Sequence, residues 1–152
     1  MLKNLSSLNY EMFCKILNNQ SISKEKVDFN SLQEEIYNNL LSEFISPIER
    51  EDIFILQKRL EEEFLVICSF SLFKTNNAFD FIEIEELLKN NISIFLELKN
   101  YRNPKKLLKL TRENKKSVIN TLASTEKTKV TELIKSLYKI DTEIERIILN
   151  NN

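Results

Sequence analysis

Hydrophobic residues recur three and four positions apart along most of the chain, which is the spacing of one face of an α-helix. The regularity is greatest near the end of the sequence, where it predicts a helix over residues 130–147. The apolar positions of that helix are Val130, Leu133, Leu137, Ile140, Ile144 and Ile147. Such alternation is typical of the seam of a helical bundle or a coiled coil.

Earlier segments show the same periodicity. The predicted apolar stripes lie at residues 2–17, 29–44, 53–67 and 81–98, and in a fifth segment that begins at Pro104. No stretch of the sequence predicts a sheet. We therefore expect an all-α protein of about six antiparallel helices, folded as a single domain over residues 1–152.

Capping residues mark several of the predicted helix ends. Ser46 can accept the free backbone N–H groups of a new helix, Pro47 suits the first helical position, and Glu49 completes a capping box. Phe44 and Ile48 flank this cap and can close over it as a hydrophobic staple. Further predicted caps are Ser23 or Asp28, Asp80, and Asn103 before Pro104.

The same corner carries the most specific motif of the chain. Residues 44–53 read Phe-Ile-Ser-Pro-Ile-Glu-Arg-Glu-Asp-Ile. This resembles the Phe-Ile-Thr-Pro-x-Asp-Arg-Glu-Asp-Ile signature of the PhoU-like phosphate-transport regulators, and the resemblance covers about residues 28–72. Positions that keep the spacing of the family on either side are Glu35, Ile36, Leu40, Leu56, Leu60, Glu61, Glu62 and Ile67. The resemblance implies two three-helix units laid along each other, with a shortened first helix.

Three residues match the signature best, and physical chemistry offers each a role. Glu51 and Asp52 lie in the first helical turn, where the helix dipole favours a negative charge by roughly 0.3–1 kcal/mol. Arg50 can bridge to carboxylates of a neighbouring helix. Together with Ser46, Pro47 and Glu49, they either fix the corner between two helices or present a surface to a transporter. The sequence leaves both roles open.

The resemblance also implies cation binding through acidic pairs spaced Glu/Asp-x-x-x-Asp, because residues four apart share one helix face. Glu61 takes the first place of such a pair, but Leu65 takes the second, and Lys115 stands where another acid belongs. We therefore expect no resident cofactor. The remaining candidates for a divalent or iron cation are Asp28, Glu61 and Glu62. The other interpretation is that residues 61–63 form the solvent-facing side of the third helix.

Charge is strongly polarised along a chain whose net charge is only −1. Residues 25–100 hold 16 acidic and 7 basic side chains, whereas residues 101–139 hold 3 acidic and 11 basic ones. The predicted basic surface comprises Arg102, Lys105, Lys106, Lys109, Arg112, Lys115 and Lys116. It either pairs with the protein's own acidic half or docks an acidic partner, phosphate groups or RNA. Few aromatic residues lie among these basic residues. This disfavours nucleic-acid binding, because few rings are present on which bases could stack.

Missing residue types narrow the function classes. The sequence contains no glycine and no histidine. These absences exclude Gly-rich phosphate loops and nucleophilic or zinc sites that need an imidazole. Cys14 and Cys68 are far apart in sequence, which favours idle or buried thiols over a metal or redox pair. No segment has the profile of a signal peptide or a membrane span.

We therefore expect a cytoplasmic, non-enzymatic regulator or adaptor of phosphate uptake. The resemblance implies that it docks on a phosphate permease or its signalling partner, and that it meets the membrane only through that partner. One alternative is a general helical interaction module that forms a homodimer through the apolar seam at 130–147. A less favoured alternative is an RNA-binding protein that uses the basic surface.

Overall fold

The computed structural model describes residues 2–42, 50–70, 82–123 and 129–150. Six helices account for almost all of them, and no strand occurs in these ranges. The helices are α1 (Leu2–Leu17), α2 (Ser23–Ser42), α3 (Arg50–Phe70), α4 (Ile82–Asn100), α5 (Pro104–Ala123) and α6 (Lys129–Asn150). The prediction of an all-α chain with six helices is confirmed.

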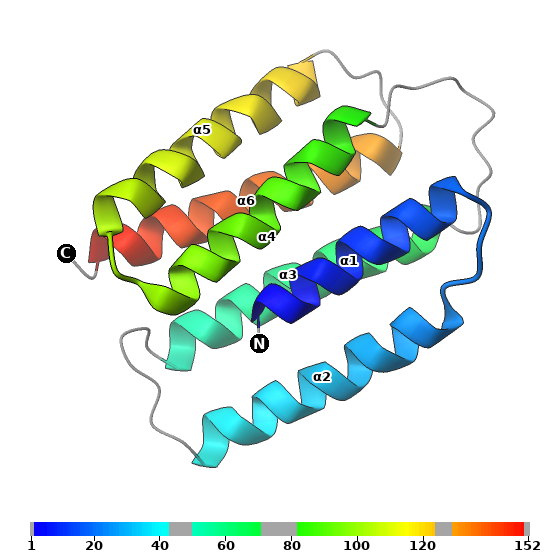
Figure 1. Cartoon of the computed structure of the whole chain (residues 1–152), viewed down its shortest axis with the longest axis horizontal. Coiled ribbons are helices and arrows are strands. Elements are labelled where there is room, and N and C mark those ends of the chain that lie inside the picture. Colours follow the sequence, from blue (N-terminus) through cyan, green and yellow to red (C-terminus); the bar gives the residue numbers. More distant parts are fainter. Residues whose placement is uncertain (1, 43–49, 71–81, 124–128, 151–152) are drawn as a thin grey trace.

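Successive helices run in opposite directions and pack as two groups of three (Figure 1). In the first group α1, α2 and α3 all contact one another, and in the second group α4, α5 and α6 do the same. The groups are joined where α1 packs on α4 and α3 packs on α6. The expected arrangement as two three-helix units is therefore present, and α1 is the shortest described helix with 16 residues.

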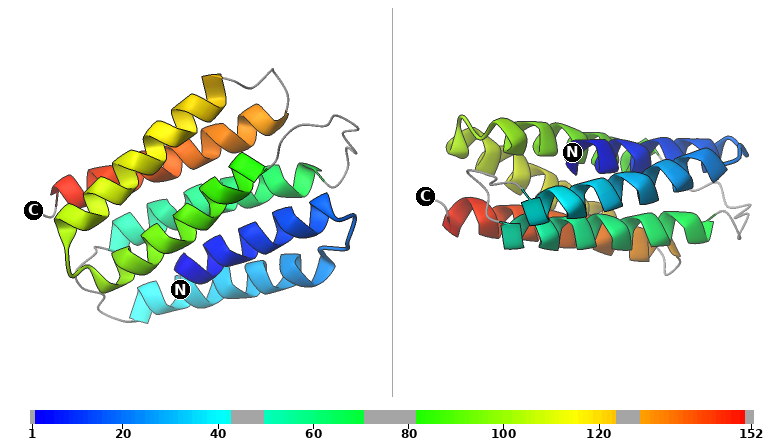
Figure 2. Two further views of the ribbon diagram at one scale, coloured as in Figure 1. Left: turned by 45° about the horizontal axis from the view of Figure 1, so that its top comes forward. Right: turned by 90° about the horizontal axis from the view of Figure 1, so that it is seen from below.

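Helices α1, α3, α4 and α6 form a four-helix core, while α2 and α5 cover its two sides (Figure 2). Helix α2 contacts only α1 and α3 among the described helices. It is held there by Phe29, whose ring stacks on that of Phe64 at 4.2 Å, and by the ion pair between Lys15 and the buried Glu25. One long side of α2 is consequently left without a neighbouring helix.

The predicted apolar stripes point into this core. All six seam positions of the 130–147 segment are buried, and so are Ile53, Leu56, Leu60 and Ile67 of α3. Helix α6 uses its seam against α3, α4 and α5 of the same chain. The seam is therefore covered within the chain, and the formation of a homodimer stays a prediction.

Local capping explains where α5 begins. The side-chain Oδ1 of Asn103 accepts the backbone N–H of Lys106 at 3.1 Å, so Asn103 caps α5 as the sequence predicted. Helix α2 begins at Ser23, and Asp28 lies inside it, so Asp28 is not a cap. The predicted caps at Ser46, Pro47, Glu49 and Asp80 lie outside the described residues. None of the described helices has both the length and the apolar composition needed to cross a membrane.

Candidate functional site

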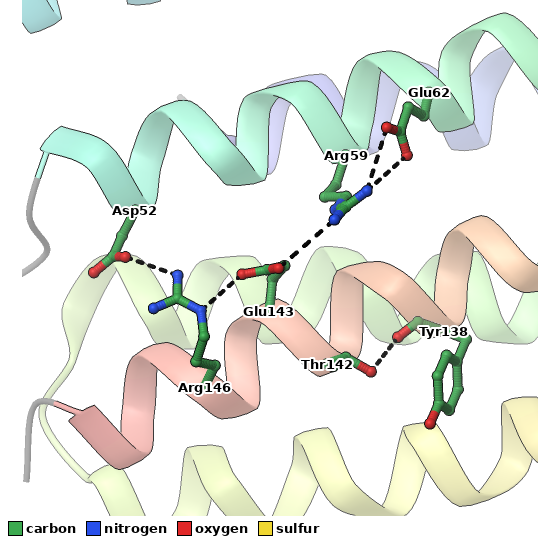
Figure 3. A network of polar contacts seen from close by, with 7 residues as sticks. All are labelled: Asp52, Arg59, Glu62, Tyr138, Thr142, Glu143 and Arg146. Atoms are coloured by element: carbon green, nitrogen blue, oxygen red, sulfur yellow. Dashed lines mark hydrogen bonds and ion pairs between the residues drawn. The ribbon is translucent and has the colours of Figure 1, made fainter.

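The described part of the signature starts at Arg50, the first residue of α3, and its Asp52 is tied to α6. Arg146 donates from Nη2 to Oδ1 of Asp52 at 2.9 Å and from Nε to Oε2 of Glu143 at 2.9 Å (Figure 3). The hydrogen bond to Asp52 and the one to Glu143 raise the pKa of Arg146. The guanidinium of Arg146 therefore joins Asp52, a carboxylate of the signature, to α6.

The ion pairs continue along the interface between α3 and α6. Arg59 lies 3.8 Å from Oε1 of Glu143 through Nη2 and 3.3 Å from Oε2 of Glu62 through Nη1 (Figure 3). Partly exposed pairs such as these contribute little individually, about 0–1 kcal/mol. Their joint effect is to hold the register of two antiparallel helices.

The three predicted cation ligands do not form one site. Asp28 is exposed on α2, and Glu61 is exposed on α3, where it accepts a hydrogen bond from Nε2 of Gln33 at 2.8 Å. Glu62 is engaged with Arg59. Within the described ranges, no group of three or more His, Cys, Asp or Glu side chains could hold a metal ion.

A groove of about 520 Å³ lies between α2 and α3. Its lining residues are Gln33, Glu34, Tyr37 and Asn38 from α2, and Phe54, Gln57, Lys58 and Glu61 from α3. The two aromatic side chains are large and exposed, Tyr37 to 50% and Phe54 to 40%. Nε2 of Gln57 donates to the backbone carbonyl of Gln33 at 3.1 Å, which joins the two walls. The groove therefore offers aromatic surface between polar walls.

Charge around this groove is mainly acidic. Glu34 and Glu61 line it. Lys58, the basic residue among its described lining residues, lies over the Phe54 ring at 4.9 Å from the ring centre. Further exposed charges on the same two helices are acidic at Asp28, Glu35, Glu51 and Glu62 and basic at Lys24 and Arg50. An apolar surface with an acidic rim is complementary to a basic amphipathic segment.

The basic surface lies on α5 and the turn before it, and several of its members pair with acids of the same chain. Lys106 contacts Glu97 at 3.2 Å, and both Arg112 and Lys115 contact Glu145, at 3.5 and 3.9 Å. The exposed members of the set are Arg102, Lys105, Lys106, Lys109, Arg112 and Lys116. Pairing within the chain thus accounts for part of the predicted basic surface.

The two thiols carry no disulfide. Cys14 and Cys68 are both half-buried, and burial raises the pKa of each. A raised pKa leaves little reactive thiolate at neutral pH. Neither cysteine has the properties of an activated nucleophile.

Five polar side chains, one from each helix except α2, lie in the interior. We call this set the central layer: Asn9 of α1, Glu63 of α3, Asn91 of α4, Asn114 of α5 and Asp141 of α6. Four of them are 0% exposed, and Asn114 is 4% exposed. The interpretation of residues 61–63 as a solvent-facing side is therefore wrong for Glu63, although Glu61 and Glu62 are exposed.

An asparagine orients each buried carboxylate. Nδ2 of Asn9 donates to Oε1 of Glu63 at 3.0 Å, and Nδ2 of Asn114 donates to Oδ2 of Asp141 at 2.9 Å. The Asn114 amide also donates to Oδ1 of Asn91 at 3.1 Å. The orienting asparagine thus comes from α1 in the first unit and from α5 in the second, while the carboxylate comes from the third helix of each unit.

Contacts on either side place these residues close together across the two units. Lys89 lies 5.8 Å from the Tyr10 ring centre, which puts Asn9 nearly level with Asn91 on the antiparallel pair α1 and α4. The charge of Glu63 acts on Asp141, so these two acids of α3 and α6 lie near each other. The layer therefore crosses the middle of the four-helix core.

Burial dominates the electrostatics of the two acids. It raises the pKa of Glu63 to about 8, against the opposing hydrogen bond from Asn9. It also raises the pKa of Asp141 to about 8, with a further contribution from the charge of Glu63. Two carboxylates that oppose each other in a low dielectric are costly to ionise together. Both are therefore largely protonated at neutral pH.

The central layer was missed in the sequence, although a signal for it exists. Four of its members lie seven residues from an apolar residue on both sides, which is a core position of a heptad. The flanking pairs are Leu2 and Ile16 for Asn9, Leu56 and Phe70 for Glu63, Ile84 and Leu98 for Asn91, and Ile134 and Ile148 for Asp141. A polar residue that has an apolar residue seven positions before it and another seven positions after it therefore marks a buried polar site.

Comparison of the chain with models of protein families, with curated proteins and with solved structures found no match.

Proposed function

We propose that this protein is a non-enzymatic adaptor that regulates phosphate uptake by docking on the cytoplasmic side of a phosphate permease. The observation that carries the proposal is the groove between α2 and α3, with Tyr37 and Phe54 exposed in it. Aromatic residues of this kind are enriched among the residues that contribute most to protein association. The groove is thus the docking site of the adaptor.

The groove's chemistry indicates the kind of segment that it takes. Its aromatic surface suits the apolar face of a helix, and Glu34 and Glu61 can pair with basic side chains beside that face. Opposite charges at the rim accelerate association and disfavour acidic partners. The partner segment is therefore a basic amphipathic helix.

The resemblance of residues 44–53 to the PhoU-like signature supports a permease as the owner of that helix. The arrangement of six helices in two three-helix units agrees with the same resemblance. Fold similarity alone does not assign a function. The permease is consequently the first partner to test.

The test is a native pull-down from phosphate-limited and phosphate-replete cells, with the wild-type protein as bait beside the double variant Tyr37→Ala/Phe54→Ala. We expect the permease to be recovered with the wild type, and its recovery to fall at least tenfold, roughly the effect of losing one strong contact, with the double variant. The matched control is Ile119→Ala, which removes an exposed apolar side chain of α5 outside the groove. It should recover the permease as the wild type does.

Failure to recover the permease under both conditions would contradict the phosphate-uptake role. A second measurement then addresses the broader alternative of a general helical interaction module. Titration with a synthetic basic amphipathic helix, followed by calorimetry, reports whether the groove binds such a segment at all. Binding that disappears in the double variant would support the module, and no binding would reject the groove as a docking site.

A further inference from the structure

We propose that the central layer binds one hard divalent cation between Glu63 and Asp141. This site is separate from the α2–α3 groove and from the exposed acids Asp28, Glu61 and Glu62. It joins the two three-helix units, because one carboxylate comes from α3 and the other from α6. Bundle cores hold cations in this way, with inward side chains from facing helices as ligands.

Each carboxylate is held by one oxygen and open at the other. Asn9 binds Oε1 of Glu63 and Asn114 binds Oδ2 of Asp141, at 3.0 and 2.9 Å. Within the described part of the chain, Oε2 of Glu63 and Oδ1 of Asp141 are buried and have no hydrogen-bond partner. A carboxylate that ligates a metal is commonly fixed through its second oxygen by such a donor.

A third oxygen belongs to the same set. Oδ1 of Asn9 is also buried and has no hydrogen-bond partner among the described residues, and its amide already contacts Glu63. Asn9 is 0% exposed. An amide oxygen and two carboxylates from three different helices are the donors that hard cations take in proteins.

The donor set also decides the class of cation. Carboxylate and amide oxygens suit Mg²⁺, Ca²⁺ and Mn²⁺, whereas Zn²⁺ and copper prefer imidazole or thiolate. The sequence contains no histidine. A dication between the two acids would compensate both buried charges, which are expensive to leave unpaired in the interior.

The experiment uses the full chain, stripped with a chelator and dialysed, at pH 7.5. MgCl₂, CaCl₂ and MnCl₂ are each added while the thermal midpoint is recorded, and calorimetry gives the stoichiometry. We expect at least one of them to raise the midpoint by about 5–10 °C at a concentration 100-fold above its dissociation constant, with one ion per chain. Glu63→Gln and Asp141→Asn should each abolish the rise.

Two further variants keep the test specific. Glu62→Gln changes the neighbouring, exposed acid and should retain the full rise. Asn9→Leu removes the third oxygen and one orienting donor, and we expect roughly 10–100-fold weaker binding. If the acid variants fail to fold, Mn²⁺ added to the wild-type protein should broaden the side-chain amide resonances of Asn91 and Asn114 before those of surface asparagines.

Either of two results would overturn the proposal. The first is an unchanged thermal midpoint and no binding heat with all three salts at 10 mM, a concentration about tenfold above the weakest calcium dissociation constants of proteins. The second is a rise that survives in both Glu63→Gln and Asp141→Asn, since the cation would then be bound on the surface. Selective broadening of surface asparagines by Mn²⁺ would lead to the same rejection.

Discussion

Arg146 donates a 2.9 Å hydrogen bond to Asp52, 94 positions earlier in the chain, and so fastens the last helix to the first turn of α3. Asp52 belongs to the segment that resembles the PhoU-like signature. Its side chain is largely covered, whereas that of Arg146 is 40% exposed. Asp52 therefore has a structural partner, Arg146, which lies outside the signature.

The pair should show measurable coupling. We expect Asp52→Ala and Arg146→Ala each to lower the free energy of unfolding, and a double-mutant cycle to give a coupling of about 0.5–1.5 kcal/mol, the range for partly exposed charged hydrogen bonds. Urea unfolding of the four proteins measures it. Lys139→Gln, an exposed change on the same helix, should alter stability by less than about 0.5 kcal/mol. Additive single effects would contradict the assigned contact.

The central layer should make stability depend on pH. In the folded chain the pKa of Glu63 and that of Asp141 are both raised to about 8. The native state therefore binds more protons than the unfolded state between about pH 4.5 and pH 8. The free energy of unfolding should consequently fall as pH rises through this window, by on the order of several kcal/mol in total. Denaturant titrations at pH 5, 6.5 and 8.5, with a chelator present, test this.

Matched variants identify the source of that dependence. Glu63→Gln and Asp141→Asn each remove one titrating group, so each should flatten the fall in stability toward pH 8. Glu62→Gln removes an exposed acid one residue away and should leave the slope unchanged. Equal wild-type stability at pH 5 and pH 8.5 would mean that the two acids are not protonated in the native state.

Alanine substitutions of two phenylalanines on neighbouring helices should distinguish a residue that packs in the core from one that lies exposed in the groove. Phe29 is fully buried and stacks on Phe64, whereas Phe54 is 40% exposed in the groove. We expect Phe29→Ala to cost about 3–5 kcal/mol, because it leaves a cavity under α2. Phe54→Ala should cost less than about 1 kcal/mol, mostly from its contact with Lys58. Chemical denaturation of both variants gives the comparison, and equal losses would refute it.

The start of α5 offers a local test. Asn103→Ala removes the side-chain acceptor for the Lys106 N–H, and we expect a loss of about 1 kcal/mol. Asn120→Ala exchanges an exposed asparagine inside the same helix, where alanine has the higher helix propensity. Its thermal midpoint should equal or exceed that of the wild type. A loss of equal size in both variants would show that the effect is not capping.

The sequence by itself determined the helices, because their formation depends on neighbours in the chain. The three-and-four spacing gave six helices, and the seam at 130–147 is buried at each predicted position. Asn103 also caps α5 as expected, since a cap acts within its own first turn. Both features are local, and a local pattern is visible in one sequence.

The tertiary structure decided which surfaces meet, because those contacts join residues far apart in the chain. Glu63 looks like the end of an exposed acidic run until α1 and α6 cover it with Asn9 and Asp141 nearby. The groove exists because α2, among the described helices, packs on α1 and α3 alone. Helix periodicity fixes which face of a helix is apolar, but only packing decides which helix covers that face and which charges it buries.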